Sequence, residues 1–528
     1  MSKGKSDKIT YKAYEQHQLH LLPPSIEELV PKEHLVRLVS EVIDEMGIEK
    51  LLRKYQTGGG ASRYHPVMMT KVCVYGYMTK VCSSRMLAKA VRENILFMWL
   101  AGNQKPDFRT LNDFRGKMLK EVMEEIFVTA VKMLAAKGYV KLENYFVDGT
   151  KIESAAGRYT FVWKKAVEKH EKKLDEKLRA YIQMAEAIWK DENEAYGNRD
   201  LEELGGKEKF TSDDVKTLAG LMRERIESLE AGNCKKKLTK ELKTVEKDCL
   251  PRKKKYEEAK RLCGERSSYS KTDQDAVFMR MKEDRMGKGQ LKPGYNAQIG
   301  TENGFVTGYD LFQKPGDTKT LKPHLRRQAK RLGVMPKAVI ADAAYGSEEN
   351  YMYLERNGVK AIMPYNMYWS EARLKGHKDI FRSENWAYSK KEKYYTCPDG
   401  RKLTYQETIQ KTTGSGYPIQ VDRYECESCA YCRKKKDCTK AQGNRTIERN
   451  GRWLRLKQKA RRTLAEEREL RKRRSVEVET VFGQLKGNQG YRRFLLRGIE
   501  KVSLEWGLLV LGYNLRRMHR VQQENAVQ

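Results

Sequence analysis

The sequence predicts an α/β protein built on a mixed β-sheet, with further segments inserted between the strands. Two observations predict this fold class. Short runs of β-branched and aromatic residues, typical of strands, occur near residues 145, 295 and 338. Segments with apolar residues at helical spacing separate them. Because 528 residues exceed what one hydrophobic core accommodates, several domains or large insertions are expected.

The N-terminal part is predicted to be helical. A run of glycines at 58–60 marks a joint between an N-terminal segment, residues 1–60, and a helical domain, residues 61–140. Helices are expected to start at His65-Pro66, after Ser83-Ser84 and after Thr110. A helix-turn-helix-like DNA-binding domain is the favoured interpretation, and a helical packing domain is the alternative. The basic residues that favour DNA binding are Arg85, Lys89, Arg92, Arg109 and Arg115.

The predicted core comprises residues 141–163 and 286–365. YFVDGTKIES indicates a buried strand that carries Asp148, and YNAQIGT and FVTGYDLFQ indicate a hairpin that turns at Asn303-Gly304. The helix TKTLKPHLRRQAKRLG follows, then the strand KAVIADAAYG with Asp342 near its end, the helix EENYMYLERNG and the strand VKAIMPY. This order is that of an RNase H-like core, in which right-handed crossovers place the strands of Asp148 and Asp342 side by side.

Three further segments complete the predicted chain. Residues 164–285 are rich in Lys, Glu, Ala and Leu at helical spacing, which predicts an inserted antiparallel helical hairpin. Its charges are interpreted as a solvated face, with a contribution to DNA binding as the alternative. Residues 366–450 alternate aromatic and polar residues and predict a β-rich insertion with a cysteine cluster. Residues 451–528 predict a basic C-terminal helix that completes the core.

The composition indicates a polyanionic partner. Lys and Arg number 105 against 71 Asp and Glu, a formal net charge of +34, which favours nucleic acid. No apolar run reaches the length of a membrane span, so no membrane partner is expected. The N-terminal residues lack the apolar core of a secretory signal. We therefore expect a cytoplasmic, nucleoid-associated protein whose ten cysteines stay reduced.

Three carboxylates suit phosphodiester chemistry. Asp148 and Asp342 belong to the predicted neighbouring strands, and Glu479 shares a helical face with Phe482 and Lys486. Converging carboxylates of this kind hold two hard cations, Mg²⁺ or Mn²⁺. One cation activates water or a DNA 3′-hydroxyl, and the other stabilises the departing oxygen. For any single carboxylate of the three, a turn or cap role is the alternative.

Three motifs, in order along the chain, resemble the signature regions of bacterial insertion-sequence transposases of the DDE class: VDGTKIES, VIADAAYGSEEN and VETVFGQLKGNQGYRRFLLRG. In one branch of that class the third region reads Y-x2-R-x3-E-x6-K. Glu479 and Lys486 meet its glutamate-to-lysine spacing, which selects Glu479 over Glu477, the fallback. The resemblance spans roughly residue 60 to the C-terminus.

The resemblance implies a role for each matching residue. Asp148, Asp342 and Glu479 would be the catalytic triad and the metal ligands, and Lys486 would contact phosphate near the cut. Ser475 stands where the branch has arginine, with Arg474 beside it as the substitute, and Lys472 stands where it has tyrosine. The basic C-terminal segment would lie against DNA backbone, with a solvated helix as the alternative. Its predicted DNA contacts include Arg473, Arg474, Arg492, Arg493 and Arg497.

The β-rich segment carries two further candidate groups. Its cysteines have C-x2-C-x2-C-x5-C spacing with one more upstream, which favours a structural zinc site over an iron–sulfur cluster or unliganded thiols. Trp369 and Trp386 are predicted to pack in the ordinary way, with stacking on a flipped DNA base as the alternative. The candidate zinc ligands are Cys397, Cys426, Cys429, Cys432 and Cys438.

The resemblance and the charge together predict a DNA transposase. It would bind the terminal inverted repeats of its element, cleave the 3′ ends and join them to target DNA, acting as a homodimer or higher assembly. The absence of a GxxxxGK[ST] motif agrees with chemistry that needs no ATP. The alternatives are an RNase H-like nuclease without strand transfer and a DNA-binding protein without catalysis.

Overall fold

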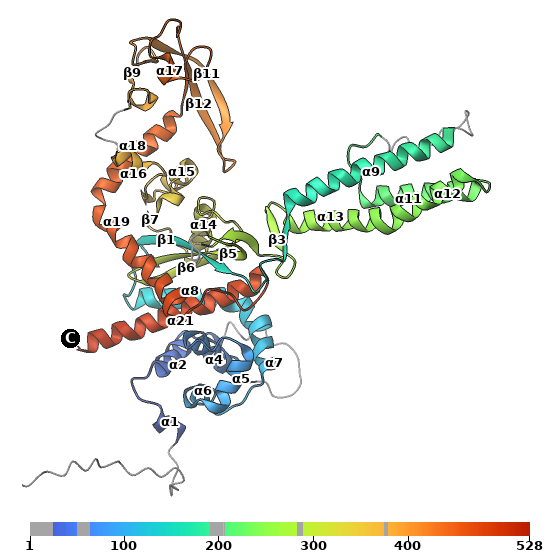
Figure 1. Cartoon of the computed structure of the whole chain (residues 1–528). Coiled ribbons are helices and arrows are strands. Elements are labelled where there is room, and N and C mark those ends of the chain that lie inside the picture. The colour runs from blue at the N-terminus through green and yellow to red at the C-terminus, as the bar shows by residue number, and fades with distance from the viewer. Residues whose placement is uncertain are drawn as a thin grey trace, which may run out of the picture. The chain divides into compact units, whose positions relative to one another are not determined.

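The structure, a computed structural model, describes residues 25–49, 64–190, 204, 206–281, 289–373 and 379–527. The chain forms two compact units, Met1–Met118 and Leu119–Gln528 (Figure 1). The glycine joint predicted at residues 58–60 lies outside the described residues. None of the described helices combines the length and apolarity that a membrane crossing requires.

The first unit is helical, as the apolar spacing predicts. Pro66 begins α4 directly after His65, and the Ser83 side chain caps α5. Helix α7 begins earlier than predicted, because the Asp107 carboxylate accepts a hydrogen bond from Thr110 N and caps the helix there. The elements are α1 (Ile26–Leu29), α2 (Leu35–Glu45), α4 (Pro66–Met78), α5 (Ser84–Glu93), α6 (Ile95–Leu100), α7 (Phe108–Asp113) and the π-helical η1 (Phe114–Leu119).

Two basic residues of this unit bind groups of the protein itself. Arg115 is 4% exposed and donates to the hydroxyls of Tyr77 and Ser84 and to a backbone carbonyl. Arg92 donates to three backbone carbonyls. Both guanidiniums therefore stabilise the helical fold. Arg85, Lys89, Arg92 and Arg109 are exposed.

The second unit is built on a six-stranded mixed sheet, which confirms the predicted α/β class. The strand order is β4-β5-β1-β7-β8, and β6 pairs with β5. Strand β1 is antiparallel to β5 and parallel to β7, and β7 is parallel to β8. The bounds are β1 (Asn144–Glu153), β4 (Val277–Arg280), β5 (Leu291–Glu302), β6 (Phe305–Phe312), β7 (Ala338–Ile340) and β8 (Lys360–Ile362).

The hairpin of β5 and β6 turns at Asn303-Gly304, as predicted. Asn303 has φ 54° and Gly304 has φ 76°. Two successive residues with positive φ suit the tight reversal between twisted antiparallel strands, and asparagine followed by glycine adopts them at low cost. The turn thereby fixes which residues of β5 and β6 face each other.

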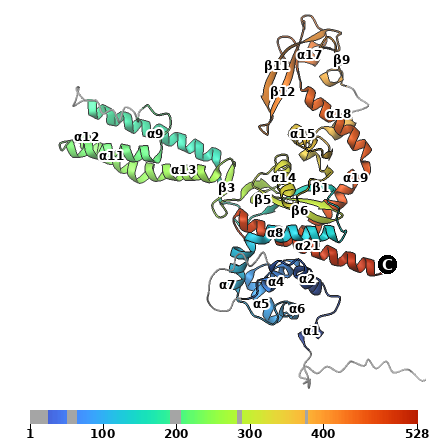
Figure 2. The same cartoon turned by 180° about the vertical axis from the view of Figure 1, so that it is seen from behind.

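One face of the sheet is covered by α8 (Lys120–Ala136) and α21 (Ile499–Val527). Asp148 pairs with Ile299, and Ile299 pairs with Tyr309, so these three side chains share a face. The Tyr309 ring meets the ring of Phe127 of α8 edge-on, with centroids 4.8 Å apart. Figures 1 and 2 show both helices along this side of the sheet. Asp148 therefore lies on the face that α8 and α21 cover.

The opposite face is covered by α14 (Leu321–Leu332) and α15 (Glu348–Arg356). Alternate residues of β1, Tyr145 and Val147, pack with Leu321 and Leu325 of α14 in one buried cluster. Gly333 ends α14 in a left-handed conformation, φ 76°. Figure 1 shows α14 on the other side of the sheet from α8 and α21. The sheet is thus the middle layer of three.

The C-terminal segment packs on the sheet through a succession of short helical pieces. Val478 is fully buried in a cluster with Phe146, Ala338, Ile340 and Ile362, on the Asp148 face. This contact fixes the segment over β1, β7 and β8. Its pieces are α18 (Gly451–Glu466), α19 (Arg468–Arg474), the π-helical η6 (Ser475–Glu479), α20 (Thr480–Phe482) and the π-helical η7 (Gly483–Asn488).

In its described residues, the segment between β1 and β4 contains three helical stretches, one more than a hairpin. They share a hydrophobic core of their own. Lys253 is 1% exposed at its side chain and pairs with Asp175 at 2.7 Å and Glu171 at 3.0 Å. The elements are β2 (Phe161–Trp163), α9 (Lys164–Lys190), α11 (Ser212–Ser228), α12 (Asn233–Thr244), η2 (Val245–Cys249), α13 (Leu250–Cys263) and β3 (Ser268–Ser270), with β2 and β3 paired.

The segment after β8 holds a separate five-stranded antiparallel sheet, of order β13-β12-β11-β10-β9. It encloses a small core that includes Trp386, Tyr395 and Tyr424. The elements are α16 (Tyr368–Arg373), η5 (Ser383–Asn385), β9 (Ala387–Ser389), β10 (Tyr394–Thr396), β11 (Lys402–Thr412), β12 (Pro418–Cys426), α17 (Lys435–Cys438) and β13 (Thr446–Arg449).

A buried polar network ties α14 to the sheet. His324 is fully buried, with Nε2 2.9 Å from Tyr145 Oη and Nδ1 2.7 Å from Asp310 Oδ2. Arg331 lies 3.2 Å from the other oxygen of Asp310. Burial acts to raise the pKa of Asp310, but the hydrogen bond from His324 and the charge of Arg331 outweigh it, so the pKa lies below its ordinary value.

We predict that Asp310→Asn lowers the free energy of unfolding by about 3 kcal/mol, because buried Arg331 loses a partner. In the wild type the stabilisation from Asp310 is complete above its unfolded pKa of about 4, and it is lost as the pH falls through the lowered folded value. Urea unfolding at several pH values measures both effects. Glu143→Gln, which removes an exposed partner of Lys337, is the control and should change stability little. An Asp310→Asn protein as stable as wild type at pH 7 would contradict this account.

Candidate active site

Asp148 lies on β1, and Asp342 lies just after the neighbouring parallel strand β7. Phe146 of β1 is in register with Ile340 of β7, and Asp148 and Asp342 each come two residues after this pair. Ile340 faces the same cluster as Phe146, and the strand alternation places Asp148 on that face, with Asp342 directly after the end of β7. Asp342 caps the 3₁₀ turn η3 (Ala343–Tyr345), where its carboxylate accepts from Ala344 N at 2.8 Å.

Glu479 ends η6, between two cations that contact β1. Arg474 Nη1 lies 3.4 Å from Asp148 Oδ2, and Lys486 Nζ donates to the carbonyl of Lys151 at 3.0 Å. The helical segment therefore runs along β1 from the level of Asp148 towards Lys151. Glu479 is one π-helical turn beyond Arg474 and exposed. It lies on the segment that passes over Asp148.

Glu477 is used elsewhere. Its side chain is 7% exposed, and its carboxylate accepts from Gly304 N at 2.7 Å and from Arg473 at 2.8 Å. Two residues along a helix rotate the side chain by about 200°. Glu477 thus anchors the β5–β6 turn and points away from the side of Glu479. Glu479, which the motif spacing selects, is exposed on the same segment.

Asp317, which the sequence analysis missed, adds a third negative charge beside Asp148 and Asp342. The buried Tyr345 hydroxyl donates to Gln298 Oε1 at 2.5 Å. Burial, and then the charges of Asp317, Asp148 and Asp342, raise the Tyr345 pKa well above its ordinary value. All three carboxylates therefore lie close enough to this hydroxyl to affect its ionisation. The detectable signal was a Gly-Asp pair between a strand and a helix at the same end of the sheet.

A hydrogen-bonded network supports this end of β1. Asp317 Oδ1 accepts from Asn296 Nδ2 at 2.7 Å and from Gln298 Nε2 at 2.9 Å. Gly149, next to Asp148, faces this network from β1. A methyl group on Gly149 would lie 2.0 Å from Gln298 Nε2 and 2.8 Å from Asp317 Oδ1. Glycine therefore lets the strand of Asp148 approach β5.

Four further arginines were predicted to contact DNA. In this structure two of them bind backbone carbonyls, one pairs with a carboxylate and one is exposed. Arg493 donates to the carbonyls of Ser154 and Ala156, and Arg497 donates to that of Ala155. Arg473 pairs with Glu477, and the Arg492 side chain is exposed. Arg493 and Arg497 thus fasten the C-terminal segment to the chain beyond β1.

The five cysteines of the β-rich segment come together. Cys397 follows β10, Cys426 ends β12, and the others belong to the loop that contains α17. All five line one cavity of about 20 Å³. The Cys429 sulfur accepts a hydrogen bond from Arg445 N at 3.2 Å. The remaining cysteines are buried thiols, except Cys234, which is exposed.

The two tryptophans of this region differ in environment. Trp386 is 8% exposed, belongs to the core of the five-stranded sheet, and donates from Nε1 to Ile380 O at 2.7 Å. Ordinary packing therefore accounts for it. Trp369 is 47% exposed, with the Arg471 guanidinium 5.4 Å from its ring centroid.

The carboxylates of the candidate active site and the thiols of the cysteine cluster are of types that bind metal ions, although neither group is arranged around a metal position. Carboxylate oxygens match Mg²⁺ or Mn²⁺, and thiolates match zinc. Among the residues that the structure describes, no three or more His, Cys, Asp or Glu side chains are arranged so that they could hold a metal ion. Binding would require the carboxylates, or the thiols, to move together.

We predict that Gly149→Ala lowers the free energy of unfolding by about 2 kcal/mol, because the added methyl group displaces Gln298 from its hydrogen bonds. Chemical denaturation measures the change. Gly157→Ala, where the methyl group would meet only Thr160 Cγ2 at 3.6 Å, should have little effect. Equal stability of the two variants would contradict the close approach at Gly149.

Two protein-family models match this chain. A model described as "Transposase domain" matches residues 24–117, which fall in the helical first unit. A model described as "Transposase DDE domain" matches residues 396–519, which include the cysteines, Glu479 and Lys486. Asp148 and Asp342 lie outside both matches. Searches of curated proteins and of solved structures give no match. With two transposase-domain models matched, the predicted resemblance to insertion-sequence transposases of the DDE class is confirmed.

Proposed function

We propose that the protein binds the terminal inverted repeats of an insertion sequence, cleaves the 3′ ends and joins them to target DNA by transesterification. The observation that carries the proposal is that Asp148 lies on the sheet face beneath the segment that carries Glu479, with Asp342 just after the neighbouring parallel strand β7. The order β6-β5-β1-β7-β8, with the first two strands antiparallel to their neighbours, supports an RNase H-like core. Both family matches support the transposase class.

Divalent metal ions fit the chemistry of this site. Three acidic side chains from two strands and a helix offer hard oxygen ligands, and the charges near Tyr345 favour a cation there. Two Mg²⁺ or Mn²⁺ ions bound by Asp148, Asp342 and Glu479 would supply an activated water or 3′-hydroxyl and stabilisation of the departing oxygen.

The cations beside the carboxylates have a proposed part in holding DNA. Arg474 lies against Asp148 and Lys486 lies over β1, so both can reach a phosphate placed above Asp148. Arg474 would exchange its carboxylate partner for that phosphate when cations occupy the site. Lys486 would hold the phosphate as a point charge from the other side.

The wider DNA complex follows from the reaction. Joining two transposon ends requires two active sites, so we propose a homodimer or a higher assembly on double-stranded DNA. The first unit would contribute binding through its exposed Arg85, Lys89 and Arg109, of which Arg85 and Arg109 flank the Phe108 ring. We propose that this complex forms in the cytoplasm, at the nucleoid.

We predict that Asp148→Asn, Asp342→Asn or Glu479→Gln each lowers DNA cleavage about 1,000-fold or more, because each removes a metal-binding charge. The assay contains Mg²⁺, a target plasmid and a labelled duplex that ends in the inverted repeats flanking the gene. DNA binding by the three variants should persist. Glu477→Gln is the matched control: glutamine still accepts from Gly304 N, so cleavage should stay within a few-fold of wild type.

Different results would exclude different parts of the proposal. Full cleavage by Asp148→Asn would overturn the assignment of the site. Cleaved ends that never join the plasmid would favour a nuclease without strand transfer. Binding without any cleavage by the wild-type protein would favour a DNA-binding protein.

We also propose a structural zinc site in the β-rich segment. The five cysteines line one small cavity, and thiolates grouped in this way suit a single tetrahedral zinc ion. The hydrogen bond from Arg445 N to the Cys429 sulfur supports a ligand role for this residue, because such bonds stabilise thiolates.

We predict one zinc ion per chain in the purified protein, measured by mass spectrometry of the elemental content. Cys429→Ser and Cys432→Ser should lose the ion and lower the unfolding temperature of the β-rich segment. Cys234→Ser, at an exposed cysteine of the helical insertion, should keep it. Zinc-free protein with all five thiols open to a thiol reagent would contradict the site.

A further inference from the structure

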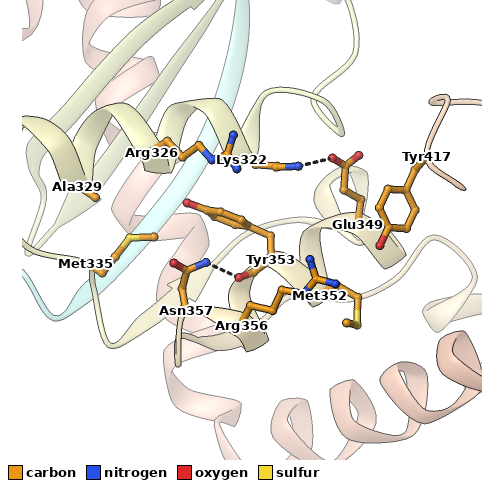
Figure 3. A pocket seen from close by; sticks show the side chains of 10 residues that line it. All are labelled: Lys322, Arg326, Ala329, Met335, Glu349, Met352, Tyr353, Arg356, Asn357 and Tyr417. Carbon is orange, nitrogen blue, oxygen red and sulfur yellow. Dashed lines mark hydrogen bonds and ion pairs between the residues drawn. The ribbon is translucent and has the colours of Figure 1, made fainter.

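A basic groove lies between α14 and α15, on the face of the sheet opposite Asp148. It has a volume of about 430 Å³, and Tyr417, from the turn between β11 and β12, contributes to its wall. Figure 3 shows side chains of the two helices facing each other across it, with Tyr417 beside Glu349. We propose that this groove binds phosphates of a DNA strand, an inference that rests on the proposed function and locates part of the DNA.

The charges in the groove are not balanced. Its cations are Lys322, Arg326 and Arg356, and its single carboxylate is that of Glu349, which pairs with Lys322 at 2.9 Å. Arg326 lies 5.6 Å from the Tyr353 ring centroid. Within the described part of the chain, neither Arg326 nor Arg356 forms an ion pair, and both are exposed. Two guanidiniums, which match phosphate geometry, therefore face the open groove.

The basic residues of α14 form two sets, one paired with carboxylates on the sheet side and one on another side of the helix. Arg327 and Arg331 point to the sheet side and are neutralised by Asp310, with Glu124 as a second partner of Arg331. The other basic residues, Lys322, Arg326 and Lys330, recur at a spacing of four, which places them on one side of the helix. Lys319 lies just before the helix. Only one side of α14 is therefore left to attract an external anion.

The dimensions of this side suit a nucleic acid strand. Lys322 and Lys330 are eight residues apart, which corresponds to about 12 Å along the helix. Phosphates along one strand of a duplex advance about 3.4 Å each along its axis. The row of cations therefore spans three to four nucleotides.

Two hydrogen bonds join the residues just before α14 to η3 and to the first turn of α15. Thr318 Oγ1 donates to Ala344 O at 2.7 Å, and Asn350 Nδ2 donates to Thr318 O at 2.9 Å. These bonds hold the first turns of α14 and α15 beside η3, which Asp342 caps. A strand that follows the groove would reach the edge of the sheet where Asp148 and Asp342 lie.

The test is the salt dependence of DNA binding by the double variant Arg326→Gln/Arg356→Gln. The probe is a random-sequence 30-base-pair duplex, because phosphate contacts do not depend on sequence. The slope of log affinity against log salt should fall by about 0.9 for each lost contact, and affinity near 0.15 M salt should fall about 30-fold for the pair. Arg326→Lys/Arg356→Lys keeps both charges and should bind almost as tightly as wild type.

A second double variant controls for net charge. Arg223→Gln/Arg261→Gln removes two exposed arginines of the helical insertion, each paired with a glutamate, and should leave the slope nearly unchanged. A groove variant with the affinity and slope of wild type would overturn the proposal. An equal loss in the control variant would do the same, because the effect would then come from total charge.

Lysine acetylation provides a measurement without mutation. Bound duplex should protect Lys319 and Lys330 from a small acetylating reagent, and should leave Lys216 of α11 open. Equal acetylation of Lys319 and Lys330 with and without DNA would overturn the proposal that DNA binds at the groove. Neither measurement requires DNA cleavage. If the wild-type protein binds DNA through the groove but never cuts it, only the proposed reaction is overturned.

Discussion

The burial of Val478 against the sheet is the contact on which the candidate active site depends. Val478 packs with Phe146, Ala338, Ile340 and Ile362, and so holds the C-terminal segment on the face that carries Asp148. Glu479 is its neighbour in the chain. A side chain on a segment that follows a long insertion could adopt many positions relative to the sheet. Apolar packing of the adjacent residue excludes most of these positions. The hydrophobic contact therefore positions a polar group that has little to anchor it.

The alternation of β1 separates two kinds of polar residue. Asp148 lies on the face beneath the C-terminal segment, with Arg474 and Lys486 near it. Tyr145 lies on the other face, in the closed network of His324, Asp310 and Arg331. That network is buried, and both oxygens of Asp310 have partners, so it serves stability. The groups on the first face are partly exposed and surrounded by cations, which suits an anionic substrate.

The two inserted segments leave the central sheet undisturbed because each has a core of its own. The helical insertion buries a separate set of leucines, and the five-stranded sheet packs Trp386 and tyrosines near its cysteines. Each insertion leaves the sheet at the end of an element, after β1 and after β8. An insertion that satisfies its own apolar surface adds little strain to the domain that carries it.

The sequence by itself determined the order of elements in the core, the hairpin at Asn303-Gly304, and the association of Asp148 and Asp342 with two strands of the core, because these follow from local turn chemistry and apolar periodicity. Motif spacing also singled out Glu479. Only the tertiary structure decided that Arg115 is buried, that Glu477 anchors the β5–β6 turn, and that Asp317 joins the carboxylates. The physical reason is that the partners of a charged side chain come from distant parts of the chain. Its neighbours in the sequence therefore do not show which groups folding places beside it.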